Sequence, residues 1–185
     1  MASAAFARGV RTLVVDLDPQ SDVSTGMDIQ VAGHLNVADV LASPKEKIVR
    51  SAIAPSGWAR SNPQSTIDVM IGSPSAINFD GPHPSVRDVW KLEEALATIE
   101  ADYDLVLIDC APSLNALTRT AWAASDRVIV VTEPGLFSVA AADRAAGTHP
   151  LRPPVLAAPL GSGRIRLGAA EVLADRAAGT ATAPD

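Results

Sequence analysis

The sequence has few aromatic residues and almost no cysteine, and both scarcities restrict what the chain can be. Phe, Trp and Tyr make up 4% of its 185 residues, so a core must be built mainly from Ala, Val, Leu and Ile. The single cysteine, Cys110, excludes an internal disulfide and a zinc cluster made of cysteines, and it fits a reducing compartment. The net charge of -6 gives no support to nucleic-acid binding through bulk positive charge.

Long hydrophobic runs are also missing. No stretch reaches the length of a membrane span, and residues 1–11, MASAAFARGVR, are too short and too weakly apolar for a secretory signal. Hydrophobic residues nevertheless make up 48% of a chain that is long enough for one domain with a sizeable core. The sequence therefore predicts a folded cytoplasmic protein that does not associate with membranes.

Several short segments rich in Val and Ile are apolar at consecutive positions, which is typical of parallel strands buried on both faces. These predicted strands are residues 12–18, 67–73, 105–111 and 127–134. Helical patterns lie at residues 35–43, 86–103 and 114–126, and another begins at 137–147. Strands that alternate with helices predict an α/β fold, with a mostly parallel sheet flanked by helices.

The remaining segments are rich in Ser, Pro, Gly and Ala. Residues 51–65 and 78–85 are predicted to be loops. From residue 146 the composition shifts to Ala, Pro and Gly, and four prolines between residues 150 and 159 exclude a long helix there. Within this part, residues 161–168 are predicted to be a loop, and residues 166–179 can form a helix. We therefore divide the chain into a domain of residues 1–145 and a tail of uncertain structure, residues 146–185.

Acidic side chains close two of the predicted strands. Asp16 and Asp18 end the first in VVDLDPQ, and Asp109 ends another in VLIDCAPS. Ligands of doubly wound sheets bind at the carboxyl ends of the strands. One aspartate there usually caps the next helix or turn. Two strands that end this way favour a site for nucleotide-bound Mg²⁺, because Mg²⁺ prefers oxygen ligands and a second carboxylate can orient an attacking water.

Two of these segments resemble motifs of the ParA/Soj family of partitioning ATPases, which are deviant P-loop NTPases related to MinD. RTLVVDLDPQSDVSTGMD resembles the second motif of the family, and YDLVLIDCAPSL resembles its Walker B motif. SDRVIVVTEPGLFSVAAADR is similar to the strand and helix that follow. The resemblance covers residues 2–145 and implies a three-layer P-loop NTPase-like fold.

The resemblance also implies roles for individual residues. Asp18 would be the catalytic carboxylate that supports hydrolysis. Asp16 would lie in the shell of Mg²⁺ and its waters, and Asp109 would hold Mg²⁺ through water. Gln20 would belong to a switch-like loop that changes with the nucleotide.

Pro112 and Ser113 would shape the nucleotide-binding turn after the Walker B motif. The chain departs from the family at two places. Ser21 and Asp22 stand where the family usually has Gly-Asn, and Ala111 and Pro112 stand where it usually has Pro-Pro. The loss of the glycine is expected to stiffen the loop.

The phosphate-binding half of such a site is not recognisable in the sequence. A P-loop presents backbone N–H groups and a lysine to the phosphates, but the pair Gly-Lys occurs nowhere in this chain. Residues 2–9, ASAAFARG, resemble the end of the helix that follows the P-loop. We therefore expect the first strand and the P-loop to be missing, the neighbouring strands to expose unpaired edges, and ATPase activity of this chain to be little or none.

For an intact member, the resemblance implies binding of ATP and Mg²⁺, an ATP-dependent homodimer, nonspecific DNA binding on the nucleoid, and hydrolysis stimulated by a ParB-type partner. This chain is expected to be an inactive or partial version. One alternative is a non-enzymatic remnant or interaction module. Another is a MinD-like regulator of division or polarity, although residues 165–179 have few large apolar side chains for an amphipathic membrane anchor.

Overall fold

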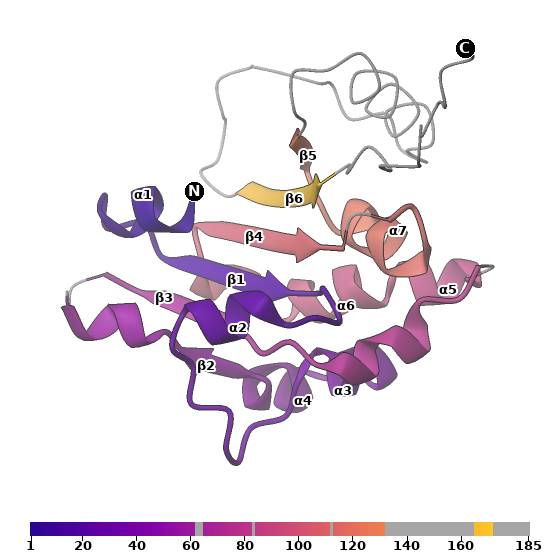
Figure 1. The fold of residues 1–185 in the computed structure, drawn as a ribbon, viewed down its shortest axis with the longest axis horizontal. Helices are drawn as coiled ribbons and strands as arrows, with labels where there is room; N and C mark the ends of the chain where they lie inside the picture. Colours follow the sequence, from indigo (N-terminus) through magenta and orange to yellow (C-terminus); the bar gives the residue numbers. More distant parts are fainter. Residues whose placement is uncertain (62–64, 83, 112, 132–164, 172–185) are drawn as a thin grey trace, which may run out of the picture.

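A computed structural model describes residues 1–61, 65–82, 84–111, 113–131 and 165–171 of the chain. Its centre is one six-stranded sheet with the order β2-β3-β1-β4-β6-β5 (Figure 1). The strands are β1 (Thr12–Asp16), β2 (Ile53–Pro55), β3 (Ile67–Met70), β4 (Leu105–Cys110), β5 (Arg127–Val131) and β6 (Ile165–Glu171). All neighbouring strands are parallel except β2, which runs antiparallel to β3. The predicted α/β fold with a mostly parallel sheet is confirmed.

Helices cover both faces of this sheet. The α-helices are α1 (Ala2–Phe6), α2 (Asp22–Gly26), α3 (Val37–Ala42), α4 (Glu46–Ser51), α5 (Val86–Val89), α6 (Lys91–Ala97) and α7 (Ala116–Ala123). The 3₁₀ helices are η1 (Gly57–Ser61), η2 (Pro74–Phe79) and η3 (Glu100–Asp102). In Figure 1, α2 lies in front of the sheet, and α3, α4 and α6 lie behind it. No helix in the described ranges has the length and apolar character needed to cross a membrane.

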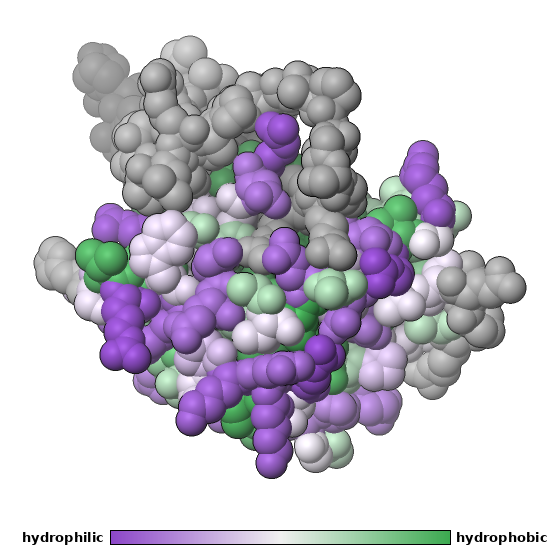
Figure 2. Space-filling view, turned by 180° about the vertical axis from the view of Figure 1, so that it is seen from behind, coloured by the Kyte–Doolittle hydropathy of each residue, from purple (hydrophilic) through white to green (hydrophobic). Residues whose placement is uncertain are grey.

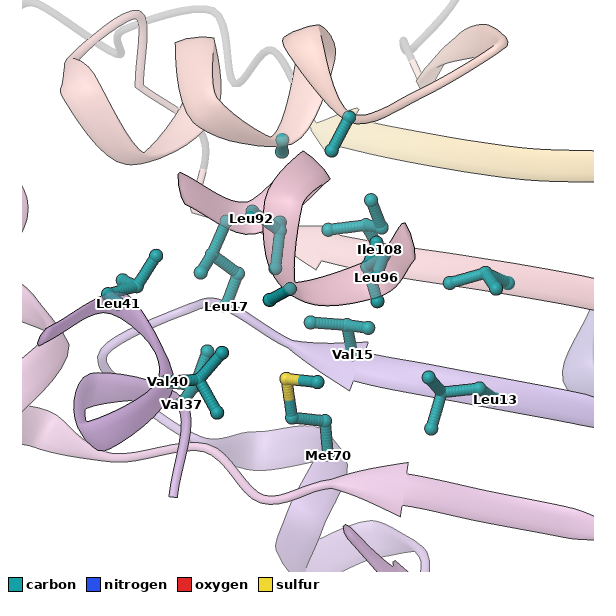
Figure 3. Close-up of a cluster of buried hydrophobic side chains, with 14 of the residues drawn as sticks. Leu13, Val15, Leu17, Val37, Val40, Leu41, Met70, Leu92, Leu96 and Ile108 are labelled. Carbon is teal, nitrogen blue, oxygen red and sulfur yellow. The ribbon is translucent and has the colours of Figure 1, made fainter. Parts of the chain in front are cut away.

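Successive residues of β1 point to opposite faces of the sheet and belong to two separate hydrophobic clusters. Leu13 and Val15 belong to the larger cluster, where they meet side chains of the neighbouring strands and of α3 and α6 (Figure 3). Val14 belongs to a smaller cluster on the opposite face, against residues of α1 and α2. Because both faces of β1 are buried, its sequence is apolar at consecutive positions instead of alternating. Seen from behind, hydrophilic residues cover most of the described surface, and hydrophobic residues form separate small areas between them (Figure 2).

The helix predicted over residues 86–103 is divided into three shorter elements. Helix α5 ends at Val89, α6 begins at Lys91, and η3 follows. The hydrophobic residues whose spacing predicted one helix do not all pack into the core. Leu92 and Leu96 are buried, but the side chains of Val86 and Trp90 are 78% and 42% exposed.

The loop predicted over residues 51–65 contains strand β2 and helix η1 instead. Strand β2 is short, and it pairs with the edge of β3 that would otherwise be unpaired. The short helices α2 and α4 were not predicted from the sequence. The helix predicted to begin at residues 137–147 lies outside the described residues.

The largest correction concerns residues 165–171, for which we predicted a loop and then the start of a helix. They form strand β6, which pairs in parallel with β4 on one side and with β5 on the other (Figure 1). The edges of β4 and β5 that face β6 are therefore paired, contrary to expectation, and β5 is an outer strand of the described sheet. The physical reason is that an open parallel edge leaves a row of backbone N–H and C=O groups unsatisfied, and any segment that adds a strand there removes this penalty.

Candidate functional site at the carboxyl edge of the sheet

The two motif-bearing strands bring their aspartates together. Strands β1 and β4 are adjacent and parallel, and Asp16 is paired in register with Asp109. The N–H group of Leu17 donates a hydrogen bond of 3.0 Å to the carbonyl oxygen of Asp109, which extends the pairing one residue beyond β1. Two carboxylates from separate parts of the sequence therefore lie side by side at the carboxyl edge, as predicted.

Asp16 is the most constrained of these residues. Its side chain is fully buried, and its Oδ2 atom accepts hydrogen bonds from the N–H and O–H groups of Ser24, at 2.8 and 2.7 Å. Its other carboxylate oxygen, Oδ1, is buried and has no hydrogen-bond partner among the described residues. Burial raises the pKa of Asp16 above its ordinary value, the bonds from Ser24 counteract this rise, and the negative charges of Asp18 and Asp22 add to it.

Gly72, just beyond β3, forms one wall against this carboxylate. Its N–H group donates a hydrogen bond of 2.9 Å to Oγ of Ser24. A Cβ atom at residue 72 would lie 2.5 Å from Oδ2 of Asp16 and 2.8 Å from Oγ of Ser21, closer than van der Waals contact allows. Only glycine fits here without displacing Asp16 or Ser21.

Asp18 organises the turn that leaves β1. Its Oδ1 atom accepts a hydrogen bond of 2.8 Å from the N–H group of Gln20, and its carbonyl oxygen accepts one of 2.9 Å from Ser21. Asp18 is half-buried, and Gln20 is exposed. Ser21 has a φ of 58°, in the left-handed region that favours glycine. Ser21 thus has the backbone conformation that glycine adopts most readily.

The end of β4 holds the remaining predicted residues. Ser113 donates its N–H group to the carbonyl oxygen of Ala111 at 2.7 Å, and its buried Oγ atom has no hydrogen-bond partner among the residues described. Pro112 lies outside the described residues. The thiol of Cys110 is buried, and this burial, followed by the charges of Asp109 and Asp18, raises its pKa. Cys110 packs as a residue of the larger hydrophobic cluster.

The residues fit a magnesium ion held mainly through water. Within the described ranges, no three His, Cys, Asp or Glu side chains come together as a ready-made metal cage. Mg²⁺ keeps several waters and needs only one or two carboxylates from the protein. The unpaired Oδ1 of Asp16, beside Asp109, supplies buried oxygen of the right chemistry.

A shallow hollow adjoins Asp109 on the face that carries α1 and α2. Its volume is about 200 Å³, and its lining includes Val14, Val23, Leu107 and Asp109. Ligand pockets for molecules of drug size are usually about 300–1,000 Å³. The hollow is therefore too small and too apolar to hold a nucleotide by itself.

Sequence reasoning predicted the aspartates but missed their supports, Ser24 and Gly72. Ser24 lies 8 residues after Asp16, and Gly72 lies 48 residues after Ser24. The available signal was that Gly72 lies inside the strand predicted over residues 67–73, where a glycine can mark a close approach of the backbone to another group. The left-handed Ser21 carried no local signal at all.

Solved structures with the same fold come from several proteins. A cobyrinic acid a,c-diamide synthase from Mycobacterium smegmatis is 20% identical, with a TM-score of 0.65 over 92% of this chain and 65% of that one. A plasmid partition protein from Borrelia burgdorferi is 16% identical, with a TM-score of 0.64 over 92% and 69%. These likenesses confirm the P-loop NTPase-like fold.

Sequence comparison gives the family. The profile of the AAA domain family matches residues 1–146. The sporulation initiation inhibitor protein Soj of Bacillus subtilis is 31% identical over 66% of this chain and 46% of its own length. The chromosome partitioning protein ParA of Caulobacter vibrioides is 32% identical over 75% and 51%. The chain spans about half the length of these curated relatives, and it belongs to the AAA domain family and, within it, to the ParA/Soj family of partitioning ATPases.

Proposed function

We propose that the carboxyl edge of the sheet is the magnesium and water side of an ATP site in a ParA-type partitioning protein. One observation carries this proposal: Asp16 has a buried carboxylate oxygen with no partner in the described part of the chain, and Asp16 lies in register beside Asp109 at the ends of two parallel strands. A buried carboxylate oxygen without a partner is unfavourable unless a ligand satisfies it.

Each acidic residue has a distinct part in this proposal. Asp16 and Asp109 hold Mg²⁺, mainly through its waters. Asp18 lies half-buried at the same edge and has one oxygen engaged by Gln20, so its other oxygen can accept a hydrogen bond from an attacking water. Bound Mg²⁺ supplies positive charge that offsets the charge on phosphate oxygens. The loop of Gln20 and Ser21 joins these residues to α2, and we propose that it responds to the nucleotide.

The residues that would bind the phosphates are not recognisable in the sequence. Phosphates in this fold class are held by a glycine-rich loop and its lysine, whereas the pair Gly-Lys does not occur in the chain. We propose that the 185-residue chain binds the cation through its carboxylates, gains little from ATP, and hydrolyses little or none. The same observation favours the second candidate function, a non-enzymatic interaction module that keeps the sheet of the family.

The biological setting follows from the relatives. Their names describe plasmid and chromosome partitioning and the inhibition of sporulation initiation. We propose that the cellular role of this chain is partitioning, with nonspecific DNA, a ParB-type protein and a second copy of the chain as partners, on the nucleoid.

The test is a titration with Mn²⁺, a paramagnetic substitute for Mg²⁺, followed by electron paramagnetic resonance. The unaltered chain should bind one Mn²⁺, and Asp109→Asn should weaken this binding by about tenfold or more. Asp104→Asn is the matched control, because Asp104 lies before the other end of β4 and pairs with Arg11 at 2.6 Å. This variant should bind like the unaltered chain.

The same titration with ATP present tests the phosphate side. ATP should leave the Mn²⁺ affinity of the protein nearly unchanged. Equal Mn²⁺ affinity in Asp109→Asn and in the unaltered chain would refute the magnesium site. A gain of about tenfold or more from ATP, lost in Asp109→Asn, would instead show that the chain contains a phosphate-binding cradle.

A further inference from the structure

We infer that Ser24 is a positioning residue for the cation site: it holds one oxygen of Asp16 so that the other oxygen alone faces the cation. This inference deepens the proposed function and rests on it. Ser24 itself is not expected to touch the metal or the nucleotide.

The hydrogen bonds define which oxygen of Asp16 is available. Both donors of Ser24 reach the same atom, Oδ2, at 2.8 Å from the N–H group and 2.7 Å from the O–H group. Bonds to an ionised carboxylate are stronger than bonds between neutral groups. Oδ2 is thus engaged twice, whereas Oδ1 has no partner within the ranges that the structure describes. The carboxylate is held in one orientation with a single oxygen left for a ligand.

Gly72 fixes the direction of the Ser24 hydroxyl. A backbone N–H group can only donate, and that of Gly72 donates to Oγ of Ser24 at 2.9 Å. The hydroxyl proton of Ser24 must therefore point elsewhere, and Asp16 accepts it. The chain of donors runs from the end of β3 through α2 to the end of β1, so three separate segments determine where one carboxylate oxygen lies.

A simpler interpretation is that Asp16 merely caps the first turn of α2. The bond from the Ser24 N–H group to Asp16 would be sufficient for that purpose. Capping requires neither the second bond from the Ser24 hydroxyl nor the link to Gly72. Ser24→Ala separates the two interpretations, because it keeps the N–H bond of the cap and removes only the hydroxyl.

The experiment compares Mn²⁺ affinities of the unaltered chain and three variants by electron paramagnetic resonance. Ser24→Ala should weaken Mn²⁺ binding by about tenfold, the lower end of the loss seen when a group that orients a metal ligand is removed. Ser24→Thr keeps the hydroxyl and should restore the affinity to within about twofold. Thr25→Ala is the matched control, because Thr25 is exposed and its hydroxyl reaches only the carbonyl oxygen of Ser21, at 3.5 Å.

A second measurement does not depend on bound metal. Amide hydrogen exchange, followed by nuclear magnetic resonance, should be faster at Gly72 in Ser24→Ala, because that N–H group has lost its acceptor. It should be unchanged in Thr25→Ala. Unchanged exchange at Gly72 in Ser24→Ala would contradict the proposed chain of donors even if no metal were bound.

The outcomes separate this inference from the proposed function. If the unaltered chain and Ser24→Ala bind Mn²⁺ equally, Ser24 only supports the fold, while the magnesium site stands. If the unaltered chain binds no Mn²⁺, the proposed function fails and the positioning role fails with it. If Ser24→Ala does not fold, Ser24→Cys keeps the volume with a weaker donor and must show the loss instead. Unaltered affinity in a folded Ser24→Cys would overturn the inference.

Discussion

Gly72→Ala is the sharpest test of how Asp16 is held. The added Cβ atom would lie 2.5 Å from Oδ2 and 2.6 Å from Cγ of Asp16, and 2.8 Å from Oγ of Ser21. Asp16 cannot simply rotate away, because Oδ2 is engaged by both donors of Ser24 and the side chain is fully buried. Either the backbone of residue 72 shifts or a bond to Asp16 breaks.

The loss of stability depends on which of these two responses occurs, the backbone shift or the broken hydrogen bond. Overpacking of a close-packed interior costs about 1–3 kcal/mol. A lost hydrogen bond to a charged group adds about 1.5–3 kcal/mol. We expect Gly72→Ala to lower the free energy of unfolding by about 2–4 kcal/mol, because relaxation relieves part of each penalty. For a chain of this length, that corresponds to a fall of about 4–16 °C in the thermal midpoint.

The assay is thermal and urea unfolding followed by circular dichroism, with Gly26→Ala as the matched control. Gly26 is the last residue of α2, a Cβ atom there would meet nothing within 4 Å, and its φ is not positive. The control variant should be unchanged or stabilised by up to about 1 kcal/mol, because alanine favours helix more than glycine does. If Gly72→Ala is as stable as Gly26→Ala, the Asp16 carboxylate is not packed against residue 72, and the reasoning on Ser24 loses its basis.

Three other predictions follow from polar contacts elsewhere in the structure. Tyr103→Phe removes a hydrogen bond of 2.8 Å to Asp68, a half-buried carboxyl whose pKa burial raises, and should cost about 1–3 kcal/mol in urea unfolding; an unchanged urea midpoint would contradict this. Asp80→Ala removes the acceptor of the Leu117 N–H group at the start of α7, and should cost about 0.5–2 kcal/mol and speed amide exchange at Leu117. Asp88→Asn should lower the thermal midpoint above about pH 4, because hydrogen bonds from Ser85 and Lys91 depress the pKa of Asp88 from 3.8 to about 2. The stabilisation by ionised Asp88 is complete above its ordinary pKa of 3.8 and is lost as the pH falls through its folded-state pKa of about 2, so the difference should shrink over this range, and a constant difference would refute it.

The sequence predicted the centre of the fold because burial on both faces leaves a clear local pattern. Strand β1 has three consecutive buried apolar residues, Leu13 to Val15, before Asp16, and β4 begins with four apolar residues, Leu105 to Ile108. Strand β2 is only three residues long and β6 follows a segment rich in Pro and Gly, so neither has such a pattern. These two strands form where backbone groups of other strands need partners, which is a tertiary effect that a local window does not contain.

The residues of the candidate site also fall into those that the sequence predicted and those that it did not. Asp16 and Asp109 were predictable, because each ends a strand and parallel strands bring their ends to one edge. Ser24 and Gly72 were not, since their role is defined by hydrogen bonds between segments that are distant in sequence. The position of Gly72 in a predicted strand indicated a close approach of some group, but only the structure identifies that group as the Asp16 carboxylate.

The loop after β1 combines features that are each unfavourable for folding. Ser21 has a left-handed backbone, and within the described ranges both its buried hydroxyl and one buried oxygen of Asp16 lack a hydrogen-bond partner. Asparagine at residue 16 would remove the buried charge, and glycine at residue 21 would remove the backbone strain. Unfavourable features that gather in one loop, at the edge where the strand ends meet, indicate a place shaped for binding more than for stability. A cation bound at Oδ1 of Asp16 would compensate the buried charge, so occupancy of this site and stability of the fold should be coupled.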